Sequence, residues 1–165
     1  MKGACMNLLE QRIRAALEEK GISFEVIEHA PVYTNPEMAE RLGVGQEFTV
    51  KNLVLKTREG EFALLLLPGN KRFDTKEVAA ALGTKSVSLA KPEEVLNLIG
   101  CEIGCVPPFG HAKPLVILMD PDLLLYEYLY FNPGSHSKSF KIPSKHLPEL
   151  CNPTMLKEET HRKNS

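Results

Sequence analysis

Several features that would assign a protein to a membrane or to the secretory pathway are missing from this sequence. No apolar run approaches the roughly 20 residues that a membrane-spanning helix needs. Residues 1–20 place acidic side chains among the apolar ones, whereas a secretory signal peptide has a continuous apolar segment. We therefore expect a cytoplasmic protein that does not associate with membranes.

An excess of charge of either sign is also missing. The formal net charge is −1, from 20 basic and 21 acidic residues, so nothing in the overall balance attracts nucleic acid. Binding to nucleic acid would need a local basic face, and scattered lysines usually form only a solvated surface. One such face could come from the basic residues of the middle third: Lys51, Lys56, Arg58, Lys71, Arg72, Lys76 and Lys85.

The spacing of the cysteines matches neither a disulfide framework nor a zinc knuckle. We expect reduced thiols at all four positions: Cys5, Cys101, Cys105 and Cys151. Two other interpretations remain open, a thiol–imidazole pair for acyl transfer and a metal site. Both would draw on the same set of residues: Cys101, Cys105, His111 and His136.

What the sequence does contain indicates one domain of the α+β class. Its 165 residues are enough for a proper core, and 43% hydrophobic residues is an ordinary share for a globular protein. Helical spacing of apolar residues, capping residues and terminal glycines predict helices at about 9–20, 34–43, 74–82, 92–99 and 144–150. Strand patterns occur at about 24–28, 48–57, 61–67, 86–89, 115–119, 126–131 and 140–142, so helices flank a mixed sheet.

The segment Gly100–Pro114 is predicted to be a shaped loop, since it holds three glycines and three prolines in fifteen residues. The apolar run that follows it, Leu115–Met119, would hold one side of the loop against the core. Gly104 would let a ligand approach closely, although a plain turn is the alternative. No glycine motif matches the phosphate-binding templates, so nucleotide hydrolysis and hydride transfer lose support.

Lys51 is unusual because it lies in a nearly continuous apolar strand, FTVKNLVLK. A buried ammonium needs a compensating partner, so Lys51 beside Asn52 is a candidate for recognition of an anion or a carbonyl. The alternative is a strand that begins only at Leu53 and leaves the lysine in solvent.

Five motifs in order resemble the aminoacyl-tRNA editing family, which includes the insertion domain of bacterial prolyl-tRNA synthetase and its freestanding YbaK-like relatives. They are VIEHAPVYT, TVKNLVLK, LLLLPGNKRFD, the G-x-x-x-P motif of Gly104–Pro108 with Phe109-Gly110, and NPGSHS. The resemblance implies an editing domain at residues 8–150, with a mixed and partly closed sheet, and flexible termini at 1–7 and 152–165. It also implies a trans-editing deacylase for mischarged tRNA, most plausibly tRNA for proline that carries alanine, cysteine or another small residue.

The same resemblance implies roles for particular residues. Lys51 matches a lysine that holds the ester carbonyl or the terminal phosphate, and Asn52 would share that task. Gly104 and Pro108 match a loop whose backbone binds the aminoacyl end and helps to place the attacking water. Five further positions are expected around the pocket: Gly134 and His136 in the second glycine loop, His29 and Thr34 at the entrance, and Phe48 in the wall.

The resemblance implies neither a cofactor nor a metal. The expected partners are the acceptor end of mischarged tRNA and prolyl-tRNA synthetase, which would deliver the tRNA. An aminoacyl ester is already activated, so an oriented water and a group that stabilises the oxyanion are sufficient for hydrolysis. A binding module that keeps affinity for tRNA or synthetase without hydrolysis is the alternative of a different class.

Overall fold

The computed structural model describes residues 7–157 of the chain. Its α-helices are α1 (Leu8–Glu19), α2 (Asn35–Leu42), α3 (Thr75–Leu82), α4 (Pro92–Ile99) and α5 (Leu147–Cys151). Short 3-10 helices occur at η2 (Gln46–Phe48), η3 (Pro121–Leu125) and η4 (Ser144–His146). The strands are β1 (Glu25–Glu28), β2 (Val50–Thr57), β3 (Phe62–Pro68), β4 (Val87–Leu89), β5 (Val116–Met119), β6 (Tyr128–Phe131), β7 (Lys138–Pro143) and β8 (Thr154–Met155).

The strands form two sheets, and this confirms the α+β class. The larger sheet has the order β4-β2-β3-β5-β8, with antiparallel pairs around β2 and parallel pairs around β5. The smaller sheet has the order β1-β7-β6 and is antiparallel. A single bridge between Thr49 and Tyr130 links the two sheets just before β2 begins.

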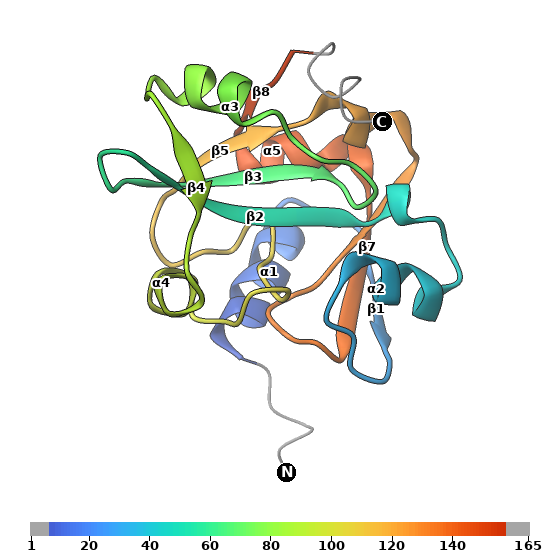
Figure 1. The fold of residues 1–165 in the computed structure, drawn as a ribbon. Coiled ribbons are helices and arrows are strands. Elements are labelled where there is room, and N and C mark those ends of the chain that lie inside the picture. Colours follow the sequence, from blue (N-terminus) through green and yellow to red (C-terminus); the bar gives the residue numbers. More distant parts are fainter. Residues whose placement is uncertain (1–6, 158–165) are drawn as a thin grey trace.

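Helices cover both faces of the larger sheet, with α3 on one face and α1 and α4 on the other (Figure 1). The face toward α3 packs a small cluster of buried residues: Leu55, Leu65, Leu67, Val78 and Leu118. The opposite face, which carries Val54, Leu64 and Leu66, joins the main core. Both faces of β3 are therefore buried, which explains its continuous apolar sequence FALLLLP.

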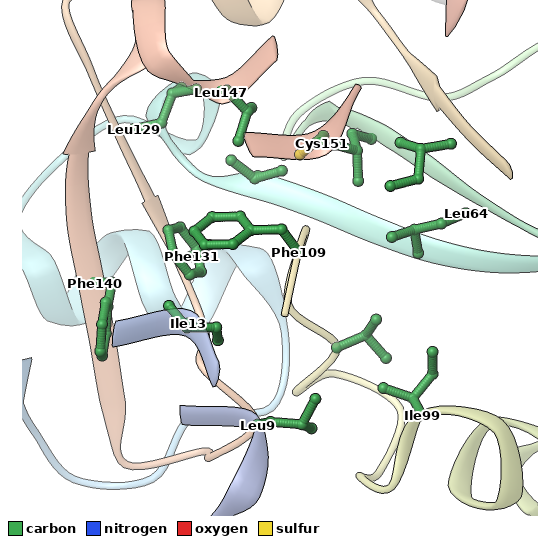
Figure 2. Close-up of a cluster of buried hydrophobic side chains, with 14 of the residues drawn as sticks. Leu9, Ile13, Leu64, Ile99, Phe109, Leu129, Phe131, Phe140, Leu147 and Cys151 are labelled. Carbon is green, nitrogen blue, oxygen red and sulfur yellow. The ribbon is translucent and has the colours of Figure 1, made fainter. Parts of the chain in front are cut away.

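A row of aromatic rings crosses the main core and connects the loop at 100–114 to the smaller sheet (Figure 2). Phe131 lies between Phe109 and Phe140, with ring centroids 5.4 and 5.7 Å away. All three side chains are buried. The loop thus contributes residues of its own to the core, Phe109 among them, and these contacts fix the loop relative to the sheets.

Local capping signals place the helix on which part of the site depends. Thr34 precedes α2 and accepts a hydrogen bond from the backbone N–H of Glu37, while Gly43 closes the helix at φ 73°. The carboxylate of Glu37 bonds the N–H of Tyr33, one residue before the position that a capping box would give. The predicted helix is therefore confirmed, with a small change in its cap.

The structure differs from the sequence-based expectations at several places. Phe48 belongs to η2, so β2 begins at Val50 rather than at 48. Of the expected flexible termini, residues 1–6 and 158–165 lie outside the described part of the chain. Thr154–Met155, however, pairs with β5 as β8, and Asn7 caps α1. Among the described helices, none is long and apolar enough to cross a membrane.

The central position of Phe131 leads to a stability prediction. Phe131→Ala should lower the free energy of unfolding by about 3–5 kcal/mol, because the cavity would open between two other rings. Leu125→Ala is the matched control, since Leu125 is 71% exposed and its loss should change stability by less than about 0.5 kcal/mol. Urea denaturation of both variants measures the difference, and equal effects would contradict this description of the core.

Candidate functional site

A cavity of about 440 Å³ opens where four segments meet at the start of β2. These segments are the first residues of β2, the turn after β3, the start of α2 and the loop at 100–114, and Gln46 of η2 and Asn132 after β6 add to the lining. The residues that line it are Tyr33, Thr34, Asn35, Pro36, Gln46, Val50, Lys51, Asn52, Leu53, Gly69, Asn70, Lys71, Arg72, Ile103, Gly104, Val106 and Asn132. This lining includes three basic side chains and no carboxylate, so the cavity favours a ligand with negative charge or a developing oxyanion.

Lys51 is the second residue of β2, and its side chain is half-buried at the cavity. Its Nζ atom donates a hydrogen bond of 2.6 Å to the backbone carbonyl oxygen of Lys71. Burial lowers the pKa of Lys51 from its ordinary value, and the nearby Arg72 guanidinium lowers it further. Burial removes part of the solvation of the ammonium, and an anionic group in the cavity would replace part of that stabilisation. The site therefore favours an anionic ligand.

Asn52, the next residue of β2, lines the same cavity, although its side chain leaves the strand on the other face. Its Nδ2 atom donates to the carbonyl oxygen of Val50 at 3.3 Å. The carboxamide oxygen Oδ1 is buried and has no hydrogen-bond partner among the described residues. A buried acceptor without a partner costs about 1–3 kcal/mol, which a ligand with a donor group would recover.

The cavity adjoins a part of β2 that has a neighbouring strand on one side only. β4 pairs with Leu55–Thr57, so within residues 7–157 the first residues of β2 pair with β3 alone. Asn35 covers this edge: its Nδ2 atom donates to Thr49 Oγ1 at 2.9 Å and to the Val50 carbonyl at 3.4 Å. The start of α2 is thereby fixed against the start of β2, and the cavity lies between them.

Gly104 lies on the wall facing α2, in a loop held by contacts at several points. Its φ is 94°, and a Cβ atom there would lie only 2.9 Å from the backbone oxygen of Tyr33. Glycine is therefore required at this position for two reasons: the positive φ angle, and the close packing against the backbone of Tyr33. Two hydrogen bonds fix the rest of the loop: the N–H of Gly134 donates to Cys105, and Arg12 Nε donates to the carbonyl of Gly110.

His136 lies directly behind Gly104 and joins the loop to the segment before α2. Its ring lies 4.4 Å from the ring of Tyr33, between centroids, and Nδ1 is 3.0 Å from the Val32 carbonyl oxygen. Nε2 is 2.9 Å from a carboxylate oxygen of Glu102. His136 therefore supports the cavity wall without lining the cavity.

Of the predicted site residues, the cavity brings together Thr34, Lys51, Asn52 and Gly104. The remaining ones lie elsewhere. Pro108 is buried, and its carbonyl accepts from the Cys151 thiol. Gly134 packs against Leu9 of α1, as its φ of 88° and the nearby Leu9 atoms show.

Two further expected pocket residues are separated from the cavity. His29 Nε2 is 2.8 Å from Ser139 Oγ, in the smaller sheet. Phe48 faces away from the cavity and packs edge-on against Tyr126, with ring centroids 5.0 Å apart. Neither residue is part of the cavity lining.

Sequence reasoning missed several of the lining residues. Asn35, Gln46 and Asn132 are polar residues within or beside the quoted motifs, yet nothing in their spacing indicates that they meet. Of the expected basic face, Lys71 and Arg72 do reach the cavity. Lys71 Nζ is paired with Asp122 at 2.8 Å, whereas Arg72 is exposed at the rim. Arg72 is therefore the cation best placed to meet a ligand from solvent.

The structure disfavours the two alternatives built on cysteine and histidine. Burial raises the pKa of Cys101 and of Cys105 to about 12, and a thiol is a poor nucleophile under that condition. His111 bonds the carbonyl of Pro107 at 2.8 Å, and burial lowers its pKa. Within residues 7–157, no group of three or more His, Cys, Asp or Glu side chains could hold a metal ion. Cys5 lies outside the described residues.

Comparison with known proteins gives a consistent result. Residues 29–150, which include the whole cavity lining, match the family model of the aminoacyl-tRNA editing domain. Multifunctional Ser/Thr-tRNA deacylase ProXp-y of Escherichia coli (strain K12) is 28% identical over 91% of this chain and 92% of its own length. Prolyl-tRNA editing protein ProX of Acetoanaerobium sticklandii is 25% identical over 86% of this chain and 89% of its own. The crystal structure of a candidate trans-editing enzyme for prolyl tRNA synthetase has a TM-score of 0.79 at 31% identity, and covers 92% of this chain and 96% of that one.

The raised pKa values predict that the buried thiols are inert. At pH 8 a thiol whose pKa is about 12 is ionised in only about one molecule in ten thousand. In a Cys5→Ser variant, a thiol-reactive disulfide reagent should therefore label the native protein at least about 100-fold more slowly than the protein unfolded in urea. Rapid labelling of native Cys105 would contradict the described burial and would favour a thiol nucleophile again.

Proposed function

The chain belongs to the aminoacyl-tRNA editing domain family, and we propose that it hydrolyses, in trans, the ester that joins a wrong amino acid to tRNA. The observation that carries the proposal is a cavity whose lining includes both Lys51 and Gly104 and contains no acidic side chain. A tRNA substrate brings both a phosphate chain and an ester carbonyl to such a cavity. It also agrees with the cytoplasmic location expected from the sequence.

The cavity favours hydrolysis by positioning rather than by a protein nucleophile. Its lining contains no cysteine, serine or histidine, and the hydroxyl of Thr34 already caps α2. Water attacks the ester carbonyl, and negative charge develops on the carbonyl oxygen, which Lys51 Nζ stabilises. Collapse of the tetrahedral intermediate expels the ribose oxygen, which takes up a proton, and releases the free amino acid and the tRNA.

The cavity has room for the end of an aminoacyl-tRNA. Its volume of about 440 Å³ is large enough to hold an aminoacyl group and part of the terminal ribose. A single methylene contributes only about 1–3 kcal/mol to discrimination, so synthetases that confuse small residues need such a second site. Alanine, cysteine and residues of similar size on tRNA for proline are the proposed substrates. Serine and threonine, named for the E. coli relative, fall in the same size range.

Delivery by prolyl-tRNA synthetase belongs to the same proposal. It is supported by the similarity to a solved structure described as a candidate trans-editing enzyme for that synthetase. The cation at the rim, Arg72, would meet the phosphates of the acceptor end, whichever protein delivers it.

Replacement of Lys51 tests the catalytic proposal. Lys51→Ala should lower kcat/KM for alanyl-tRNA for proline by about 100-fold or more, because the developing oxyanion loses its cation. The variant should remain folded, since the side chain is only partly buried. Lys85→Ala is the matched control, because Lys85 is exposed and does not line the cavity, and its rate should equal that of the wild type.

Two outcomes would separate the alternatives. If Lys51→Ala keeps its activity, the assignment of Lys51 is wrong. If the wild type binds tRNA but hydrolyses none of the mischarged forms, the chain is a binding module of the same family, and the cavity serves recognition alone.

Asn52 is assigned to the α-amino group of the substrate. The unpartnered Oδ1 atom accepts hydrogen bonds, so it is suited to a donor group of the substrate. The α-amino group is the donor that every aminoacyl ester brings, and the cavity lining contains no carboxylate to compete for it.

A substrate without the amino group tests this assignment. Asn52→Leu should lower kcat/KM for alanyl-tRNA by about 10- to 100-fold, because a hydrogen bond to a charged or polar donor is lost. The same variant should leave hydrolysis of propionyl-tRNA, which lacks the amino group, nearly unchanged. An equal loss for both substrates would show that Asn52 supports the cavity in another way.

A further inference from the structure

A second hollow of about 230 Å³, here called the aromatic cleft, lies on the smaller sheet and η2. Its lining is Val44, Phe48, Glu127, Tyr128, Tyr130 and Lys141. Three of the four tyrosines in the sequence lie in this region, since Tyr126 packs against Phe48 at its edge. No residue of the aromatic cleft lines the cavity described above.

The position of the rings follows from the alternation of β6. Leu129 and Phe131 point into the core and are fully buried, so Tyr128 and Tyr130 point outward. Tyr128 is 39% exposed, which leaves much of a large ring in contact with solvent. Exposed aromatic surface that gathers at one place indicates an interaction site.

A cation lies against these rings. Lys141 of β7 is directly opposite Tyr130 in the strand pairing, and its Nζ atom is 4.5 Å from the ring centroid of Tyr128. Its ion pair with Glu25 is long, at 3.7 Å, and that glutamate is largely exposed. Lys141 can therefore turn toward an incoming anion without losing a strong partner.

The aromatic cleft and the cavity share one wall. Gln46, the first residue of η2, lines the cavity, whereas Phe48, the last residue, lines the aromatic cleft. The next residue, Thr49, forms the bridge to Tyr130 and accepts the hydrogen bond of Asn35 from the cavity side. A chain-like ligand that has its end in the cavity can reach the aromatic cleft by passing over η2.

We propose that the aromatic cleft binds unpaired nucleobases of the tRNA 3′ end, next to the terminal nucleotide that carries the amino acid. Stacking on aromatic rings, with a nearby cation for the backbone, is how proteins hold single-stranded RNA. Glu127, the only carboxylate in the lining, disfavours a phosphate beside it, so the rings receive the base and Lys141 the phosphate. This inference rests on the proposed deacylase function and extends its substrate site beyond the ester.

A comparison of two substrates tests the proposal. Tyr128→Ala should raise KM for alanyl-tRNA by about 5- to 100-fold, because one stacked base loses its platform. It should leave kcat/KM for 3′-O-alanyl-adenosine unchanged, because that ester lacks the neighbouring nucleotides. Tyr128→Phe keeps the ring and should match the wild type on both substrates.

Direct binding separates this proposal from the deacylase proposal, since it needs no turnover. A fluorescently labelled single-stranded CCA trinucleotide should bind the wild type and Tyr128→Phe equally, and should bind Tyr128→Ala about 5- to 100-fold more weakly, by anisotropy. Equal binding by all three proteins would overturn the proposal, as would an equal kinetic loss on both substrates. In either case the aromatic cleft would be a surface for a protein partner or a structural feature.

Discussion

The site depends on one hydrogen bond, which the ammonium of Lys51 in β2 donates to a backbone carbonyl oxygen. Lys51 is placed by the pairing of β2 with β3, and its ammonium is fixed by the oxygen of Lys71 in the turn that follows β3. Burial lowers the pKa of Lys51, and the charge of Arg72 in the same turn lowers it further. The β2–β3 pair and the turn that follows it therefore supply both the cation that we propose to stabilise the oxyanion and its immediate environment.

Much of this could be predicted from the sequence, because the informative residues break a local rule. A lysine in an apolar strand and a glycine in a proline-rich loop both predict a special environment, and the structure places Lys51 and Gly104 on one cavity. The capping residues predict where the helices begin and end, as Thr34 and Gly43 show for α2. Gly104 serves a purpose that the sequence did not indicate, since it makes room for the backbone of Tyr33.

The remainder of the site depends on contacts between distant segments. Asn35 and Asn132 are ordinary loop or cap residues in the sequence, and only the packing of α2 and of the second glycine loop brings them to the cavity. Phe48 lies outside the cavity because η2 directs its ring toward Tyr126. Apolar periodicity in the sequence does not reveal this change of direction. The same turn gives the cavity and the aromatic cleft their common wall.

The most direct test of the central claim is an NMR titration with an alanyl-adenosine analogue in which an amide replaces the ester. Because this analogue cannot be hydrolysed, it should remain bound in the cavity. The largest shifts should occur in the side-chain amide of Asn52 and the backbone N–H of Gly104, and Lys51→Ala should weaken binding. Shifts confined to other surfaces, with both of these signals unchanged, would contradict it.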